Sequence, residues 1–140
     1  MIKYGYNLDE ISYQMGFIGC FSEMVAAKLK KIALSKPAKI ENVKAIEKSA
    51  DYLTKSYDIY YYVDYDMVKN NIISDEELKD RAIFVLYEKK EYLDEYMALK
   101  KKQEEAISNG TYTDNTKKET TLKLCELLCY SKEMVKQKYL

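Results

Sequence analysis

The sequence predicts a mainly α-helical protein with a four-helix-bundle-like architecture, and three observations support this class. First, only four glycines and one proline occur among 140 residues, too few for the frequent turns of an all-β protein. Second, apolar residues recur every three or four positions over long stretches, which is the period of an amphipathic helix. Third, a 47% share of hydrophobic residues suits one globular domain, which we assign to residues 1–140.

The first predicted element is one long helix, Asn7–Leu34. Asn7 is its expected N-cap, because acidic residues follow in the first turn. A main apolar stripe runs along the segment, and Phe17, Phe21 and Met24 form a second stripe beside it. Two stripes predict contacts on several sides, so we place this helix at the centre of the bundle. Small residues in the same segment would let a neighbouring backbone approach closely: Gly16, Gly19 and Cys20.

Two short runs, residues 58–65 and 82–87, fit either a helix or a strand. The first run is rich in tyrosine, isoleucine and valine, which favour strands. The second has six apolar or aromatic residues in succession, and periodicity cannot separate a buried strand from a buried helix over so short a length. We favour helices, which complete the bundle. The alternative is an α+β fold in which two short strands near 58–65 and 82–87 pack against helices.

Apolar periodicity and capping signals place the other helices. Residues 43–56 continue a helical stripe. Ser74–Glu77 and Thr116–Glu119 match the capping-box pattern that starts a helix. Gly110 is the expected left-handed C-cap of the helix that precedes the second box. From that box, one last helix is predicted to reach Val135.

The chain has no histidine, and this absence removes many catalytic sites. Ser-His-Asp and Cys-His nucleophile systems, histidine-containing zinc sites and di-iron bundles all need that side chain. The glycine-rich loops that hold phosphates in nucleotide-binding proteins are also missing from the sequence. The sequence therefore weighs against an enzyme without excluding one, and we expect no cofactor.

Charge and targeting signals narrow the expected partners. Basic and acidic residues balance at 23 each, and Arg81 is the only arginine, whereas nucleic-acid-binding proteins concentrate positive charge and favour arginine. We therefore expect no nucleic-acid partner. The sequence contains neither a signal-peptide pattern nor an apolar run of about 20 residues, so we expect a cytoplasmic protein without membrane association.

Cys20, Cys125 and Cys129 fit a reducing cytoplasm better than a disulfide framework. Three thiolates could hold a soft metal ion, but two cysteines four positions apart in a helix, with one distant partner, lack the spacing of a structural zinc site. Cysteine is often buried as a small hydrophobic residue. We therefore predict reduced cysteines and no metal.

Four residues are candidate ligand-binding groups: Glu23, Ser22, Asp64 and Tyr60. Glu23 is the only charge between residues 11 and 27, and a carboxylate in apolar surroundings has the raised pKa that general acids and bases need. Ser22 beside it occupies a core position of the helix. Asp64 interrupts an apolar stripe, where it could accept hydrogen bonds from the N–H groups that begin the first helix. The structural alternatives are a solvent-facing Glu23 and a helix-capping Asp64.

Tyr60 belongs to a dense group of tyrosines between Tyr57 and Tyr65, in a chain that contains 15 of them. Phenols can line a pocket that stacks on and hydrogen-bonds a planar or polar ligand. Alternatively, an AT-rich coding sequence enriches tyrosine, whose ring can be buried at the edge of a core while its hydroxyl stays in water. We favour this second interpretation.

The first functional hypothesis is a helical protein that acts by self-association, most simply as a homodimer, or by binding a protein partner. Its helices carry more apolar surface than four elements can cover, and exposed apolar patches usually mark interfaces. We expect some of the apolar residues on the third and fourth segments to remain uncovered in a monomer: Ile83, Leu86, Leu93, Met97, Leu122, Cys125 and Cys129. The alternative is a small-molecule-binding protein or enzyme that uses buried carboxylates and tyrosines, and a deep pocket lined by Glu23, Asp64 and Tyr60 would favour it.

Overall fold

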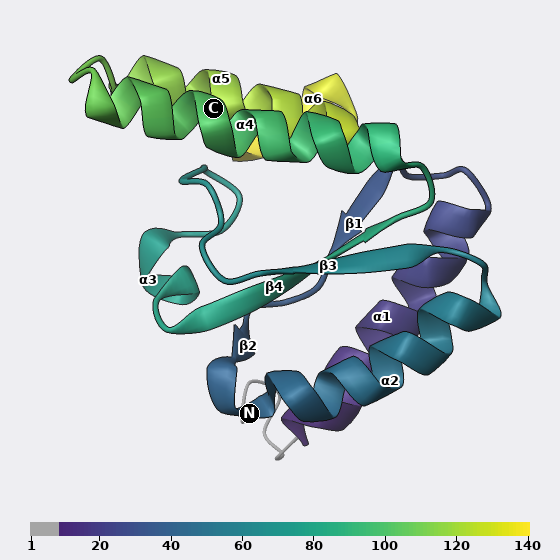
Figure 1. Ribbon diagram of the computed structural model, residues 1–140. Coiled ribbons are helices and arrows are strands. Elements are labelled where there is room, and N and C mark those ends of the chain that lie inside the picture. Colours follow the sequence, from purple (N-terminus) through teal and green to yellow (C-terminus); the bar gives the residue numbers. More distant parts are fainter. Residues whose placement is uncertain (1–8) are drawn as a thin grey trace.

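In the computed structural model, which describes residues 9–140, a small antiparallel sheet lies between two groups of helices (Figure 1). Helices α1 and α2 cover one face, and α4 with α5 covers the other. The four-helix bundle is therefore wrong, and so is an all-α class. The alternative α+β fold is correct, because the runs at 58–65 and 82–87 both contain strands.

The elements follow in chain order. They are α1 (Glu10–Ala26), β1 (Ile32–Leu34), β2 (Ala38–Lys39), a 3-10 turn η1 (Ile40–Asn42), α2 (Val43–Ser56), β3 (Tyr60–Asp64), α3 (Asp75–Leu78), β4 (Arg81–Tyr87), α4 (Lys90–Ser108), α5 (Asp114–Leu127) and α6 (Lys132–Lys138). The helix predicted at residues 43–56 is thus confirmed. Of the helices in this part of the chain, none has the length and apolar character needed to cross a membrane.

Strand β4 is the centre of the sheet and pairs antiparallel with the other three strands. Tyr87 lies opposite Ile32 of β1 and also opposite Tyr60 of β3, so these two strands flank β4. Strand β2 continues along the β1 side after an interruption. There Ser35 donates its N–H to the Phe84 carbonyl at 2.9 Å, and the Ser35 hydroxyl accepts the Phe84 N–H at 2.9 Å.

Both faces of β4 are buried, which explains its uninterrupted apolar sequence. Side chains alternate between the faces of a strand, so Phe84 and Leu86 join the core under α1 and α2. Ile83 and Val85 join the core under α4 and α5. The strand thus covers internally the apolar surface of Ile83 and Leu86, which we had expected to face outward.

The prediction of one helix over Asn7–Leu34 is wrong in two respects. The helix ends at Ala26, and Lys28 turns the chain with a left-handed φ of +67°, after which residues 32–34 pair with β4. It is also not central, because α1 lies with α2 in an outer layer that covers one face of the sheet (Figure 1). Asp9 caps it by accepting the N–H groups of Ile11 and Ser12; the expected cap Asn7 lies outside the described residues.

The other helix ends agree with most of the capping signals. Ser74 and Glu77 form the predicted capping box of α3, and Gly110 has the predicted left-handed φ, at +68°. The second box is displaced, because Thr113 is the N-cap of α5 and Thr116 is its partner. One continuous last helix is also wrong: the chain turns at Cys129, with a φ of +60°, and α6 follows as a separate helix.

Candidate functional site

The four predicted site residues do not form one site. Glu23 is exposed on α1, whereas Ser22 is buried beneath the same helix and its hydroxyl has no hydrogen-bond partner. Asp64 is buried on the α4 side of the sheet. Tyr60 is 57% exposed and lines a hollow of about 320 Å³ at the start of β3, to which none of the other three contributes. The geometry therefore gives no support to a shared pocket.

Asp64 is the centre of a closed polar cluster rather than the cap of the first helix. Its carboxylate accepts the Tyr96 hydroxyl at 2.5 Å, the Lys100 ammonium at 2.7 Å and the Asp66 N–H at 2.9 Å. The carboxylate is fully buried, and the Lys100 side chain is only 14% exposed. Burial, reinforced by the charge of Asp64, raises the pKa of Tyr96 well above its usual range. The cluster connects the end of β3 to α4 and leaves no polar atom directed at a ligand.

The most distinctive surface is a groove along the outer side of α1, which we call the α1 groove. An aromatic ladder of Tyr13, Phe17 and Phe21 forms one side of it, with ring centroids 4.9 and 5.5 Å apart. Small residues at the same four-residue spacing form the other side: Ser12, Gly16 and Cys20. The groove has a volume of about 400 Å³. A methyl group placed on Gly16 would meet no atom within 4 Å, so the recess is open.

This side of α1 is unusual because it carries no charge. Between Glu10 and Glu23 no residue of the helix is charged, whereas a surface helix normally has charged residues on its solvent side. Glu10 itself is turned aside, where it accepts the Lys39 N–H at 3.1 Å and lies 3.9 Å from Arg81. The exposed middle of α1 is therefore apolar or neutral throughout.

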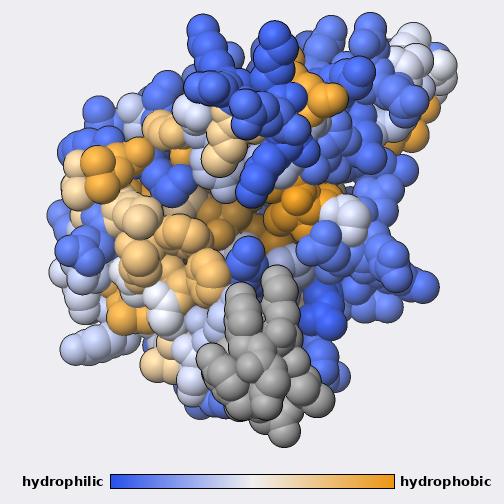
Figure 2. All heavy atoms as spheres, turned by 180° about the vertical axis from the view of Figure 1, so that it is seen from behind, coloured by the Kyte–Doolittle hydropathy of each residue, from blue (hydrophilic) through white to orange (hydrophobic). Residues whose placement is uncertain are grey.

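A second recess extends this apolar face beyond α1. It has a volume of about 180 Å³ and shares Phe17 and Phe21 with the α1 groove. Residues from β1, the loop between β1 and β2, the loop before α3 and the C-terminal segment continue it: Leu34, Pro37, Ile72, Ile73, Tyr130 and Tyr139. Three polar or charged residues also line it: Ser35, Lys36 and Glu77. The Lys36 ammonium lies 5.3 Å from the centroid of the Phe17 ring, at the rim. Figure 2 shows apolar side chains gathered on this hollowed side of the molecule.

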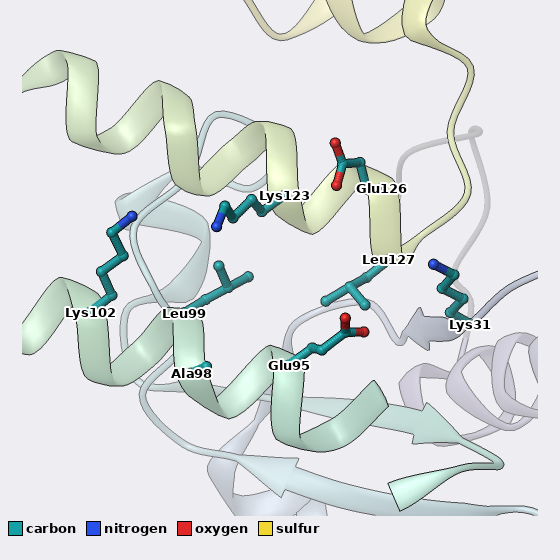
Figure 3. A pocket seen from close by; sticks show the side chains of 8 residues that line it. All are labelled: Lys31, Glu95, Ala98, Leu99, Lys102, Lys123, Glu126 and Leu127. Carbon is teal, nitrogen blue, oxygen red and sulfur yellow. The ribbon is translucent and has the colours of Figure 1, made fainter. Parts of the chain in front are cut away.

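A third hollow, of about 280 Å³, lies between α4 and α5 (Figure 3). Leu99 and Leu127 form its floor, and five charged side chains surround it: Lys31, Glu95, Lys102, Lys123 and Glu126. Lys102 and Lys123 lie at one end of the rim and Glu95, Glu126 and Lys31 at the other (Figure 3), and all five are exposed. This is the composition of a solvated groove between packed helices, and it offers no concentrated charge of one sign.

The cysteines do not assemble a site. Within residues 9–140 no group of three or more cysteine, aspartate or glutamate side chains could hold a metal ion. Cys125 is buried, and burial raises the pKa of its thiol to about 11. Cys20 and Cys129 are exposed, and Cys20 is one of the small residues of the α1 groove.

Comparison of the chain with protein-family models, with curated proteins and with solved structures gave no match. Four residues of the α1 groove were recognised in the sequence, Phe17 and Phe21 as part of a second apolar stripe and Gly16 and Cys20 as small residues beside it, whereas Ser12 and Tyr13 were missed. The predicted bundle placed that stripe in the interior, because the first helix of such a bundle would be surrounded by the others.

Proposed function

We propose that the protein acts by self-association, as a homodimer in which the α1 grooves of two copies pack against each other. The observation that supports it is the uncharged outer side of α1, with an aromatic ladder beside a row of small residues. The three rings of the ladder are half-buried, and apolar surface that stays partly exposed in this way often marks an interface. The expected patch on the third and fourth segments plays no part in this proposal.

A second copy suits the groove because the groove contains both halves of a complementary contact. In an antiparallel pair centred near Gly16 and Phe17, the Phe17 ring of each copy enters the recess over Gly16 of the other. Such a twofold arrangement uses the same patch on both chains. Small residues let helix backbones approach closely, and the formal net charge of zero opposes association little.

Sedimentation equilibrium over a hundredfold concentration range tests the proposal. We expect a species of twice the 16.5 kDa chain mass in the native protein. Phe17→Glu should abolish it, because two carboxylates would be buried against apolar residues. Gly16→Leu should weaken it by filling the recess, while a leucine in place of glycine favours the helix itself.

Tyr52→Glu is the matched control, because Tyr52 is a 74% exposed aromatic residue on α2, outside the α1 groove. The control should dimerise like the native protein. A native protein that stays at the monomer mass throughout contradicts the proposal, and a dimer unaffected by both α1 substitutions assigns association to another surface.

A further inference from the structure

The outer edge of β3 is an unpaired sheet edge. The hydrogen bonds of β4 show which backbone N–H and carbonyl groups of β3 point outward from this edge. Phe84 directs its N–H and its carbonyl to Ser35, on the β1 side of β4. Both groups of one residue in an antiparallel strand point the same way, and alternate residues point to opposite sides. Phe84 lies opposite Val63, and Leu86 opposite Tyr61. Tyr61 and Val63 therefore direct their N–H and carbonyl groups away from the sheet.

Nothing in the described chain occupies these groups. Beyond the strand ladder itself, no backbone or side-chain hydrogen bond of residues 9–140 reaches the main chain of Tyr61 or Val63. In Figure 1, β3 lies at the front of the sheet, and no helix or strand crosses its outer edge. The edge is open along its length.

Apart from the buried Asp64 at its end, this edge lacks the lysines, prolines and interruptions with which proteins protect exposed strands. Lysines, prolines and interruptions prevent an edge from pairing with other chains. The opposite edge has all three, with Lys36 and Pro37 in its interruption and Lys39 in β2. In contrast, residues 59–63 are isoleucine, three tyrosines and valine, which suit a paired strand.

We propose that β3 binds an extended segment of a partner protein, which adds to the sheet as a strand and carries basic residues at its ends. Main-chain groups of Tyr61 and Val63 supply the hydrogen bonds in this mode of recognition. Acidic residues flank the strand and supply the charge preference: Asp58 precedes it and Asp66 follows it, both exposed. At the start of β3, the neighbouring hollow contains Asp51 and Asp58 against one lysine, Lys55.

The same charges argue against a second copy as the occupant of this edge. Two β3 strands would form the most hydrogen bonds in an antiparallel pair with Tyr61 of each copy opposite Val63 of the other, because these two residues carry the outward groups. In that register the turn that holds Asp58 of each copy and the bend that holds Asp66 of the other lie at the same end of the pair. Two acidic residues would then be brought together at each end, and repulsion between like charges disfavours this pairing. Self-association and strand addition therefore use different surfaces, and this inference does not rest on the α1 groove.

The test uses an acetylated and amidated peptide, of the same length as residues 58–66, with a lysine at each end and alternating valine and threonine between. We expect it to slow amide hydrogen exchange at Tyr61 and Val63 about tenfold or more at saturation. A peptide with glutamate at both ends should bind roughly threefold to tenfold more weakly. A third peptide, with the lysines retained and prolines in its centre, should not protect these amides.

Two variants of the protein complete the experiment. Val63→Pro removes an outward N–H that makes no bond within the sheet, so it should abolish amide protection at Tyr61. If that variant does not fold, the double variant Asp58→Asn and Asp66→Asn tests the edge without touching its backbone, and it should remove the preference for lysine over glutamate ends. Binding without protection of Tyr61 and Val63, or no binding at millimolar peptide, overturns the proposal. Protection that increases with protein concentration alone also overturns it, because the occupant is then a second copy.

Discussion

Asp64→Asn tests whether the buried cluster between β3 and α4 stabilises the fold. The substitution keeps the size of the side chain but removes its charge, so the Lys100 ammonium, 2.7 Å away and 14% exposed, loses its only ion-pair partner among the described residues. Hydrogen bonds to charged groups contribute about 1.5–3 kcal/mol each. Breaking a buried pair on one side costs about 3–5 kcal/mol. We expect the free energy of unfolding to fall by about 3 kcal/mol.

The measurement is urea denaturation at neutral pH, followed by circular dichroism. Glu88→Gln is the matched control, because it removes an acid from the solvent-exposed pair with Lys28, and exposed ion pairs contribute about 0–1 kcal/mol. In the double variant Asp64→Asn with Lys100→Met, the unpaired ammonium is gone as well. Its loss should therefore be smaller than the sum of the two single losses by about 1–3 kcal/mol.

Two results would refute this reasoning. An Asp64→Asn protein within about 0.5 kcal/mol of the native one would mean that solvent already compensates the Lys100 charge. Additive losses in the double variant would mean that the two side chains contribute separately, through packing rather than through their charges.

Three further predictions concern titration, reactivity and backbone strain. The free energy of unfolding, measured by urea titration, should fall as the pH rises above 9. The reason is that the unfolded chain releases protons from Cys125 and Tyr96, whereas the folded protein holds both pKa values high. A free energy of unfolding that stays constant up to pH 11 would contradict this. Iodoacetamide should alkylate Cys20 and Cys129 before Cys125, with mass-spectrometric mapping as the measurement. Gly110→Ala should destabilise the protein by about 1 kcal/mol in thermal unfolding, because alanine is strained at a φ of +68° even where space is open.

Local signals in the sequence predicted local structure well. The capping box at Ser74, the left-handed Gly110 and the helix at residues 43–56 depend on neighbours within a few positions, and all three are present. Residues 82–87 could not be assigned in this way. An apolar run with no helical or strand periodicity indicates burial on all sides, but it does not tell whether a helix or a strand is buried. Only pairing with strands from distant parts of the chain makes it β4.

The first helix shows why the candidate site was harder to predict than the secondary structure. The aromatic stripe with Phe17 and Phe21 was recognised, but a stripe in the sequence does not tell whether the fold covers it. Whether a helix face is covered depends on how many layers of helices and sheets the fold has and on the order in which they pack. Once residues 32–34 leave the helix and pair with β4, α1 has the sheet on one side and α2 beside it. The stripe is then only partly covered, and Phe17 and Phe21 are half-buried at the α1 groove.

The two proposed surfaces lie on different sides of the molecule, and this separation makes them independent. The edge of β3 is seen in Figure 1, whereas the apolar face of α1 is seen from behind in Figure 2. A dimer formed through α1 would therefore present two β3 edges, one from each copy, and linked sites raise the apparent affinity for a partner that can reach both. Phe17→Glu should then leave the binding of a single peptide unchanged while it removes the extra affinity for two tethered peptides. Loss of single-peptide binding in that variant would show that the two surfaces are coupled through the sheet.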